Sequence, residues 1–85
     1  MFRVEWSERS VRRLDRLDRE VARAIVRYMA ERVQTAESPR SLGRPLRGEG
    51  IWRYRVGDYR VLCQIRDDVM IVLVIEVGHR RDVYR

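Results

Sequence analysis

Three arginines on a predicted β-hairpin are the residues in this sequence best suited to chemistry. The stretch 51–64, IWRYRVGDYRVLCQ, has two β-rich runs around a Gly-Asp pair, which fits a two-residue type II′ turn. That turn sets Arg55 opposite Arg60, and alternation puts Arg53 on the same face. Like charges directly opposite each other destabilise a sheet by roughly 0.2–1 kcal/mol per pair, so we expect a bound anion to offset the repulsion. Arginine forks match phosphate oxygens, although a solvated face whose arginine stems cover apolar sheet surface is the ordinary alternative.

The opposite face of this hairpin is apolar, which predicts that it packs on the core. Its single cysteine has no partner for an internal disulfide, so we expect a small buried hydrophobe in a reducing compartment. The residues of this face are Trp52, Tyr54, Val56, Tyr59, Val61 and Cys63.

A second group of chemically capable side chains comes after a long apolar run near the C-terminus. The run 69–77, VMIVLVIEV, predicts a strand in the middle of the sheet, ended by Gly78. A polar, fraying end is the ordinary interpretation of the last seven residues, 79–85, but their content points to a site beside the hairpin arginines. Among them are the only histidine, the first two of three arginines and a tyrosine: His79, Arg80, Arg81 and Tyr84.

Glu76 is the one charged residue in that run, and the side it faces depends on the preceding turn. A two-residue turn at Asp67-Asp68 puts Glu76 on the core face, whereas one extra loop residue puts it among the arginines. We expect the second arrangement, because an acid there offsets the repulsion between the arginines.

The stretch 36–50, AESPRSLGRPLRGEG, predicts the one real loop, because two prolines and three glycines interrupt any periodicity. Arg40, Arg44 and Arg47 make it basic. Either this loop reaches an extended nucleic acid or it is simply a basic loop. The three arginines of this loop, together with Arg81, are therefore candidate RNA-binding residues.

The remaining elements are a strand and two helices that must support these side chains. Alternating apolar residues predict a strand over 2–6. Ser7 and Asp18 are expected N-caps, which gives helices over 8–16 and 19–34 that form an αα-hairpin. The first helix also carries four arginines that are typical of a solvated helix face: Arg9, Arg12, Arg13 and Arg16.

These elements predict one α+β domain over residues 1–85. We expect a small, mainly antiparallel sheet of about four strands with the N-terminal αα-hairpin packed on one face and the active surface on the other. The pairing direction of the first and last strands stays open.

The charge of the chain predicts an acidic partner. The net charge is +6 and the pI about 10.6, and all 19 basic residues are arginine. Because a complete lack of lysine indicates a genomic bias, not every arginine is read as a phosphate contact.

Several classes of protein and of site are not expected. The chain shows no apolar signal-peptide core and no run long enough to span a membrane, so we expect a cytoplasmic protein with no membrane partner. No Cys/His metal spacing, glycine-rich phosphate loop or paired nucleophile and base is visible, so we expect no metal and no cofactor. A basic surface with one imidazole and several phenols suits phosphodiester chemistry without metal.

Three stretches together resemble the RelE-like toxins of bacterial and archaeal toxin–antitoxin systems, within the RelE/ParE superfamily. They are ESPRSLGRPLRG, WRYRVGDYRVLCQI and VIEVGHRRDVY, and the order of elements extends the resemblance over essentially the whole chain. The resemblance implies a toxin that enters the ribosome and cuts mRNA in the A site, that is, an mRNA interferase. It also implies that a cognate RelB-like antitoxin neutralises the toxin.

The implied reaction is an attack of the ribose 2′-hydroxyl on the adjacent phosphate, which leaves a 2′,3′-cyclic phosphate and a 5′-hydroxyl. The basic hairpin positions of the family fall on Arg53, Arg55 and Arg60, and its C-terminal arginine and tyrosine fall on Arg80 and Tyr84. The resemblance thereby assigns arginines to charge stabilisation and the tyrosine to orienting a splayed base.

The proton acceptor is the difficult assignment. Some relatives have lysine where this chain has Arg53 and Arg55, and arginine does not give up its proton. Either catalysis relies on positioning and electrostatics, or His79 or Glu76 takes the proton. We expect the first, with His79 as an auxiliary catalytic residue.

Two other functions stay open. The ParE-like branch shares the fold but poisons DNA gyrase and is not a nuclease, so it has no need for the arginine face together with Arg80 and Tyr84. A non-catalytic RNA-binding module would keep the surface without turnover.

Overall fold

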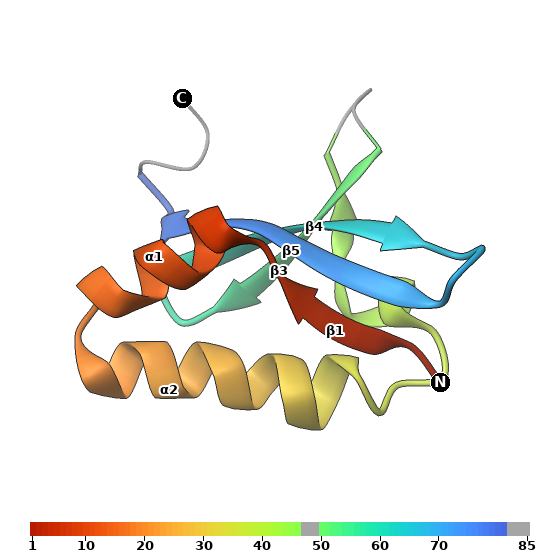
Figure 1. Cartoon of the computed structure of the whole chain (residues 1–85), viewed down its shortest axis with the longest axis horizontal. Coiled ribbons are helices and arrows are strands. Elements are labelled where there is room, and N and C mark those ends of the chain that lie inside the picture. Colours follow the sequence, from red (N-terminus) through yellow and green to blue (C-terminus); the bar gives the residue numbers. More distant parts are fainter. Residues whose placement is uncertain (47–49, 82–85) are drawn as a thin grey trace.

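The chain folds into a twisted sheet with two helices on one of its faces (Figure 1). The computed structural model describes residues 1–46 and 50–81. The α+β class predicted from the sequence is confirmed. The elements in chain order are β1 (Arg3–Trp6), α1 (Glu8–Arg16), α2 (Arg19–Tyr28), a π-helical turn (Met29–Val33), a 3-10 helix (Pro39–Leu42), β2 (Arg44–Pro45), β3 (Ile51–Val56), β4 (Tyr59–Arg66) and β5 (Ile71–His79).

The sheet has the strand order β1-β5-β4-β3-β2. β1 pairs with β5 in parallel, which answers the question of direction left open by the sequence, and the other pairs are antiparallel. β5 thus lies inside the sheet between β1 and β4, as its apolar faces predicted. It begins at Ile71 and ends at His79, two residues beyond the predicted end, because Gly78 and His79 still pair with β4.

The segment 36–50, predicted as one irregular loop, contains a 3-10 helix and strand β2, which is the additional strand of the sheet. The 3-10 helix brings the chain to β2, which pairs with β3. Gly43 permits this close approach: a Cβ on it would lie 3.0 Å from Cε1 of Tyr54 and 3.1 Å from the backbone oxygen of Arg53. The expectation of about four strands is corrected to five for this reason. The prolines and glycines of this segment predict a loop, but they do not show that part of it pairs with β3.

The register predicted for the central hairpin is confirmed. Arg55 is opposite Arg60 and Tyr54 is opposite Val61. Gly57 has φ 59°, the left-handed value that favours glycine at the first central position of the turn.

Glu76 lies on the arginine side of the sheet, as expected, but the cause differs from the one predicted. The turn before β5 has four residues, because Arg66 pairs with Ile71, and two extra residues leave the alternation unchanged. The pairing then shifts between Leu62 and Cys63: Leu62 is opposite Glu76, whereas Cys63 is opposite Val74. This β-bulge at Ile75 moves every later side chain of β5 to the other face.

Both predicted helix caps are present. The Ser7 hydroxyl accepts from the Ser10 N–H at 3.1 Å, and the Asp18 carboxylate accepts from the Glu20 N–H at 3.2 Å. Leu17 between them has an extended backbone, which separates α1 from α2. The second helix was predicted to run to residue 34; its α-helical part ends at Tyr28 and the π-helical turn continues it to Val33.

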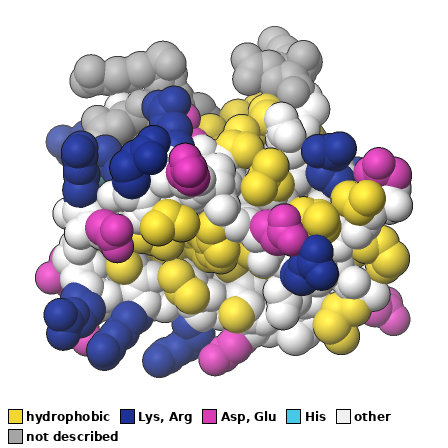
Figure 2. All heavy atoms as spheres, in the orientation of Figure 1, with side chains coloured by type: hydrophobic (Ala, Val, Ile, Leu, Met, Phe, Trp, Pro, Cys, Tyr) yellow, Lys and Arg dark blue, Asp and Glu magenta, His cyan; other side chains and the backbone are white. Residues whose placement is uncertain are grey.

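The core lies between the helices and the inner face of the sheet. Its fully buried members come from α2 and its π-helical turn (Ile25, Met29, Val33), the hairpin (Tyr54, Val61, Cys63) and β5 (Val72, Val74). On the outside, basic side chains gather over α1 and α2, with a hydrophobic area between them (Figure 2). Among the described residues, no helix is both long and apolar enough to cross a bilayer.

Tyr54 ties the 3-10 helix to this core. Its buried hydroxyl donates to the Pro39 carbonyl at 2.6 Å, and burial raises the pKa of Tyr54. We expect Tyr54→Phe to lower the free energy of unfolding by about 1–3 kcal/mol, because it leaves a carbonyl without its partner. Urea unfolding measures this. Tyr28→Phe is the matched control, since the Tyr28 hydroxyl donates no hydrogen bond within the described residues, and equal midpoints for both variants would contradict the prediction.

Candidate nucleic-acid interface

Four arginines meet on the open face of the sheet, the face that the helices leave uncovered. Arg55 is opposite Arg60 in the β3–β4 ladder, and Arg44 is opposite Arg53 in the β2–β3 ladder. Together with Leu42 they line a hollow of about 130 Å³. We call Arg44, Arg53, Arg55 and Arg60 the arginine surface.

The electrostatics of the arginine surface suit a multiply charged anion. Each of its two opposed pairs sets like charges on neighbouring strands, which is unfavourable by roughly 0.2–1 kcal/mol per pair. The sequence predicted only the Arg55–Arg60 pair, because the Arg44–Arg53 pair depends on strand β2. A phosphate that bridges either pair replaces repulsion with charge-assisted hydrogen bonds. Guanidinium groups remain protonated, so these residues stabilise negative charge and do not accept a proton.

Arg80 extends the site by one step beyond the end of β5. Its backbone N–H donates to the Asp58 carbonyl at 2.9 Å, which continues the β4–β5 ladder. Gly78 is opposite Arg60, and residues two apart on a strand face the same way, so Arg80 is on the side of the arginine surface. The predicted association of Arg80 with the hairpin arginines is therefore consistent with the register.

His79 faces the other way. It is opposite Tyr59, whose partner Val56 belongs to the inner side of the hairpin. The imidazole makes an edge-on contact with the Tyr59 ring, with centroids 5.4 Å apart, and its Nδ1 accepts from the Arg81 N–H at 3.3 Å. The structure does not bring His79 together with the arginine surface.

Arg40, a predicted RNA-binding residue, is engaged elsewhere. Its guanidinium donates to both carboxylate oxygens of Asp67, at 2.9 and 2.7 Å, and lies 5.6 Å from the ring centroid of Trp52. This hydrogen-bonded pair raises the pKa of Arg40 and lowers that of Asp67. Two other predicted residues, Arg47 and Tyr84, lie outside the described residues.

Glu76 and Cys63 are the remaining groups with possible chemistry near the sheet. The Glu76 carboxylate is on the open face, 3.6 Å from the Arg9 guanidinium of α1, and its side chain is 34% exposed. Cys63 is buried, and burial raises the pKa of its thiol, so it is no nucleophile. Within residues 1–46 and 50–81 no three His, Cys, Asp or Glu side chains gather as metal ligands would.

The contact between Arg9 and Glu76 brings the arginines of α1 close to the end of β5. The sequence predicts a solvated helix face for these arginines, whereas in the structure they line a hollow beside β5. Their regular spacing was the available signal. What the sequence could not show is that β1 pairs only with Ile71–Val74 and leaves α1 next to the end of β5.

Comparison with known proteins places these features in a family. A family model described as the ParE toxin of the type II toxin–antitoxin system parDE matches residues 4–84. Toxin RelG of Mycobacterium tuberculosis is 31% identical over 86 residues, which cover 99% of this chain and 97% of RelG. Toxin RelE of the same organism is 34% identical, with coverage of 99% and 87%.

Solved structures share the fold. The chain matches one from a RelBE toxin–antitoxin complex of M. tuberculosis with a TM-score of 0.84 and 30% identity, covering 93% of this chain and 98% of that one. It also matches a mutant of E. coli toxin RelE in the free state with a TM-score of 0.77 and 25% identity, covering 96% and 86%.

Proposed function

Since the chain belongs to the RelE-like toxins of the RelE/ParE superfamily, the toxin components of type II toxin–antitoxin systems, we propose that it is a ribosome-dependent endoribonuclease. It cuts mRNA in the ribosomal A site and thereby stops translation. The observation that carries this proposal is the arginine surface with Arg80 beside it, because such a surface matches the charge of a phosphodiester at its transition state.

The proposed cleavage of RNA requires one bond to form, one bond to break and one proton to move at each oxygen. The ribose 2′-oxygen bonds to phosphorus as the bond from phosphorus to the 5′-oxygen breaks, and the 2′-proton is lost while the 5′-oxygen gains one. Negative charge builds up on the phosphorane oxygens. Arg55, Arg60 and Arg80 stabilise that charge, and Arg53 holds the strand next to them. No step requires a metal or a cofactor.

Alignment of the 2′-oxygen with phosphorus then supplies much of the rate. Glu76 is next to the Arg9 guanidinium and His79 faces away from the arginine surface, which supports positioning and electrostatics over a dedicated base. The auxiliary role expected for His79 is not part of this proposal, because its ring lies against Tyr59 on the other face of the sheet. Tyr84 is proposed to stack on a splayed base, and Arg40, Arg44, Arg47 and Arg81 to contact RNA, including ribosomal RNA.

A RelB-like antitoxin is the proposed protein partner. Several of the solved relatives are RelB–RelE complexes, and a chain of net charge +6 suits an acidic partner. We propose that the antitoxin covers the arginine surface and blocks RNA from it. The affinity of this complex is then expected to fall as salt concentration rises.

Poisoning of DNA gyrase is the second candidate function. It is favoured by the description of the matching family model, which names a ParE toxin. The two functions require different features of the open face. A nuclease needs arginines placed around a scissile phosphate, whereas a gyrase poison does not.

Cleavage of an end-labelled mRNA tests the proposal. The purified, antitoxin-free toxin is incubated with that mRNA, alone and on ribosomes stalled at a defined codon. We expect cuts within the A-site codon only when ribosomes are present, with a cyclic phosphate at the new 3′ end. Absence of cutting by the folded protein, together with inhibition of gyrase supercoiling, would replace this function by the second.

A further inference from the structure

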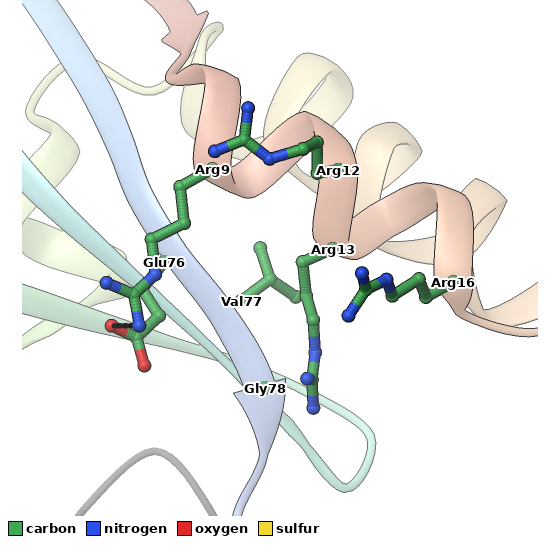
Figure 3. A pocket seen from close by; sticks show the side chains of 7 residues that line it. All are labelled: Arg9, Arg12, Arg13, Arg16, Glu76, Val77 and Gly78. Atoms are coloured by element: carbon green, nitrogen blue, oxygen red, sulfur yellow. Dashed lines mark ion pairs between the residues drawn. The ribbon is translucent and has the colours of Figure 1, made fainter.

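A groove lies between α1 and the end of β5 (Figure 3). β1 pairs only with Ile71–Val74, so beyond that point β5 has no partner strand on this side within the described chain, and α1 lies there instead (Figure 1). The groove has a volume of about 360 Å³. Its lining, which defines the α1 groove, consists of Arg9, Arg12, Arg13, Arg16, Glu76, Val77 and Gly78.

The spacing of the α1 arginines puts four positive charges on one helix face. Arg12, Arg13 and Arg16 follow Arg9 by three, four and seven residues, which are the separations of neighbours along a helix side. Like charges three or four apart destabilise a helix, so this arrangement disfavours the isolated helix. The two acids of α1, Glu8 and Asp15, do not line the groove, and the single carboxylate among its described lining residues, that of Glu76, is next to Arg9.

The α1 groove and the arginine surface are adjacent. Gly78 lines the groove and is opposite Arg60, which lines the hollow of the arginine surface. Neighbouring strands are only about 4.8 Å apart, and glycine has no side chain to stand between them. Glu76, on the open face and in contact with Arg9, shows that the groove opens toward the same side.

We propose that the α1 groove is a second phosphate-binding subsite, which holds the RNA strand on one side of the phosphate that is cut. This inference rests on the proposed function and extends it from one phosphate to a path. A strand that crosses the arginine surface passes over Gly78 and meets the guanidinium groups of α1. Its phosphates relieve the repulsion along α1, as the scissile phosphate does on the sheet.

The lining favours nucleic acid over a protein segment. Four guanidinium groups offer repeated, planar contacts to a polyanion, which is what phosphates along a strand require. A peptide would also need apolar contacts, and Val77, which is the one large apolar side chain in the part of the lining that the structure describes, is buried in the core.

Binding of single-stranded oligouridylates to the full chain tests this subsite. Fluorescence anisotropy compares a strand long enough to cross both hollows with a trinucleotide that fits the arginine surface alone. The test variant is Arg12→Gln/Arg16→Gln, whose residues are exposed. The control is Arg19→Gln/Arg23→Gln, which removes the same charge at the same spacing from the exposed side of α2.

We expect the test variant to weaken binding of the long strand about ten-fold, and to reduce the salt slope by about 0.7 for each phosphate that it no longer neutralises. Its affinity for the trinucleotide stays that of the native chain, and the control binds both probes as the native chain does. Arg12→Lys/Arg16→Lys, which keeps the charge, retains most of the affinity for the long strand and so separates the effect of charge from that of a misfolded helix.

The results that overturn the inference are distinct from those that overturn the function. If the test variant binds the long strand as the control does while Arg55→Gln weakens both probes, the subsite is wrong and the arginine surface stands. If the test variant loses binding only to a glutamate-rich peptide, the groove is a protein-binding surface instead. If the native chain binds neither RNA probe, the subsite is wrong, whereas the proposed function stands or falls with the ribosome-dependent cleavage assay.

Discussion

Replacing Arg80 with alanine is expected to slow cleavage of ribosome-bound mRNA about a hundred- to a thousand-fold. A donor of this kind, aimed at the charge that develops in the transition state, contributes that much in other enzymes. The fold is expected to survive, because Arg80 is exposed and the bond to Asp58 comes from its backbone N–H, which alanine keeps. Single-turnover cleavage at a defined codon measures the loss, and the unfolding midpoint checks stability.

Arg23→Ala is the matched control for this experiment, since Arg23 is exposed on α2, on the helical side of the sheet. Arg80→Lys separates charge from geometry: it keeps the charge but loses the fork, and should fall between the native chain and alanine. If Arg80→Ala cuts mRNA at the native rate, Arg80 has no part in catalysis. If the Arg80→Ala variant also inhibits gyrase as strongly as the native chain does, the result supports the ParE-like function.

Arg55→Gln is expected to change stability and activity in opposite directions. Removing one partner of the Arg55–Arg60 pair relieves repulsion and should raise the free energy of unfolding by roughly 0.2–1 kcal/mol. The same change removes a phosphate contact and should lower cleavage about a hundred-fold. Stability gained as activity is lost is typical of residues kept for function. Urea unfolding and the cleavage assay on one preparation give both numbers.

Arg66→Gln is the comparison for this second prediction. Arg66 ends β4 opposite Ile71, so its removal relieves no direct arginine pair. We expect neither a gain in stability nor a loss of cleavage. A loss of stability in Arg55→Gln would mean that Arg55 stabilises the hairpin. The pairing of Arg55 with Arg60 would then have a structural explanation that needs no bound anion.

The hairpin could be predicted from sequence because its register is a local property. The Gly57 turn and the alternation around it fix which residues are opposite, and Arg55 and Arg60 are only five positions apart. The N-caps Ser7 and Asp18 were predictable for the same reason: a cap bonds to a backbone N–H two or three residues away.

Features that depend on distant contacts were predicted less well. Arg44 joins the site through a two-residue strand that forms only because Gly43 fits against Tyr54. His79 was grouped with Arg80 because they are neighbours in sequence, yet adjacent residues of a strand face opposite ways. Glu76 was put on the correct face, but through the length of the turn, whereas the bulge at Ile75 is the cause.

The parallel pairing of β1 with β5 bears on how this protein is made. Its first strand, Arg3–Trp6, hydrogen-bonds to Ile71–Val74, so the sheet closes only after β5 has left the ribosome that synthesises it. Contacts so far apart in sequence form late, because the long intervening chain must first be ordered. The pairing of Gly78 with Arg60 and the bond from Arg80 to Asp58 also require β5, which pairs there with β4. The complete site, with Arg80 beside the arginine surface, therefore assembles only after β5 has been synthesised, later than the β3–β4 hairpin itself.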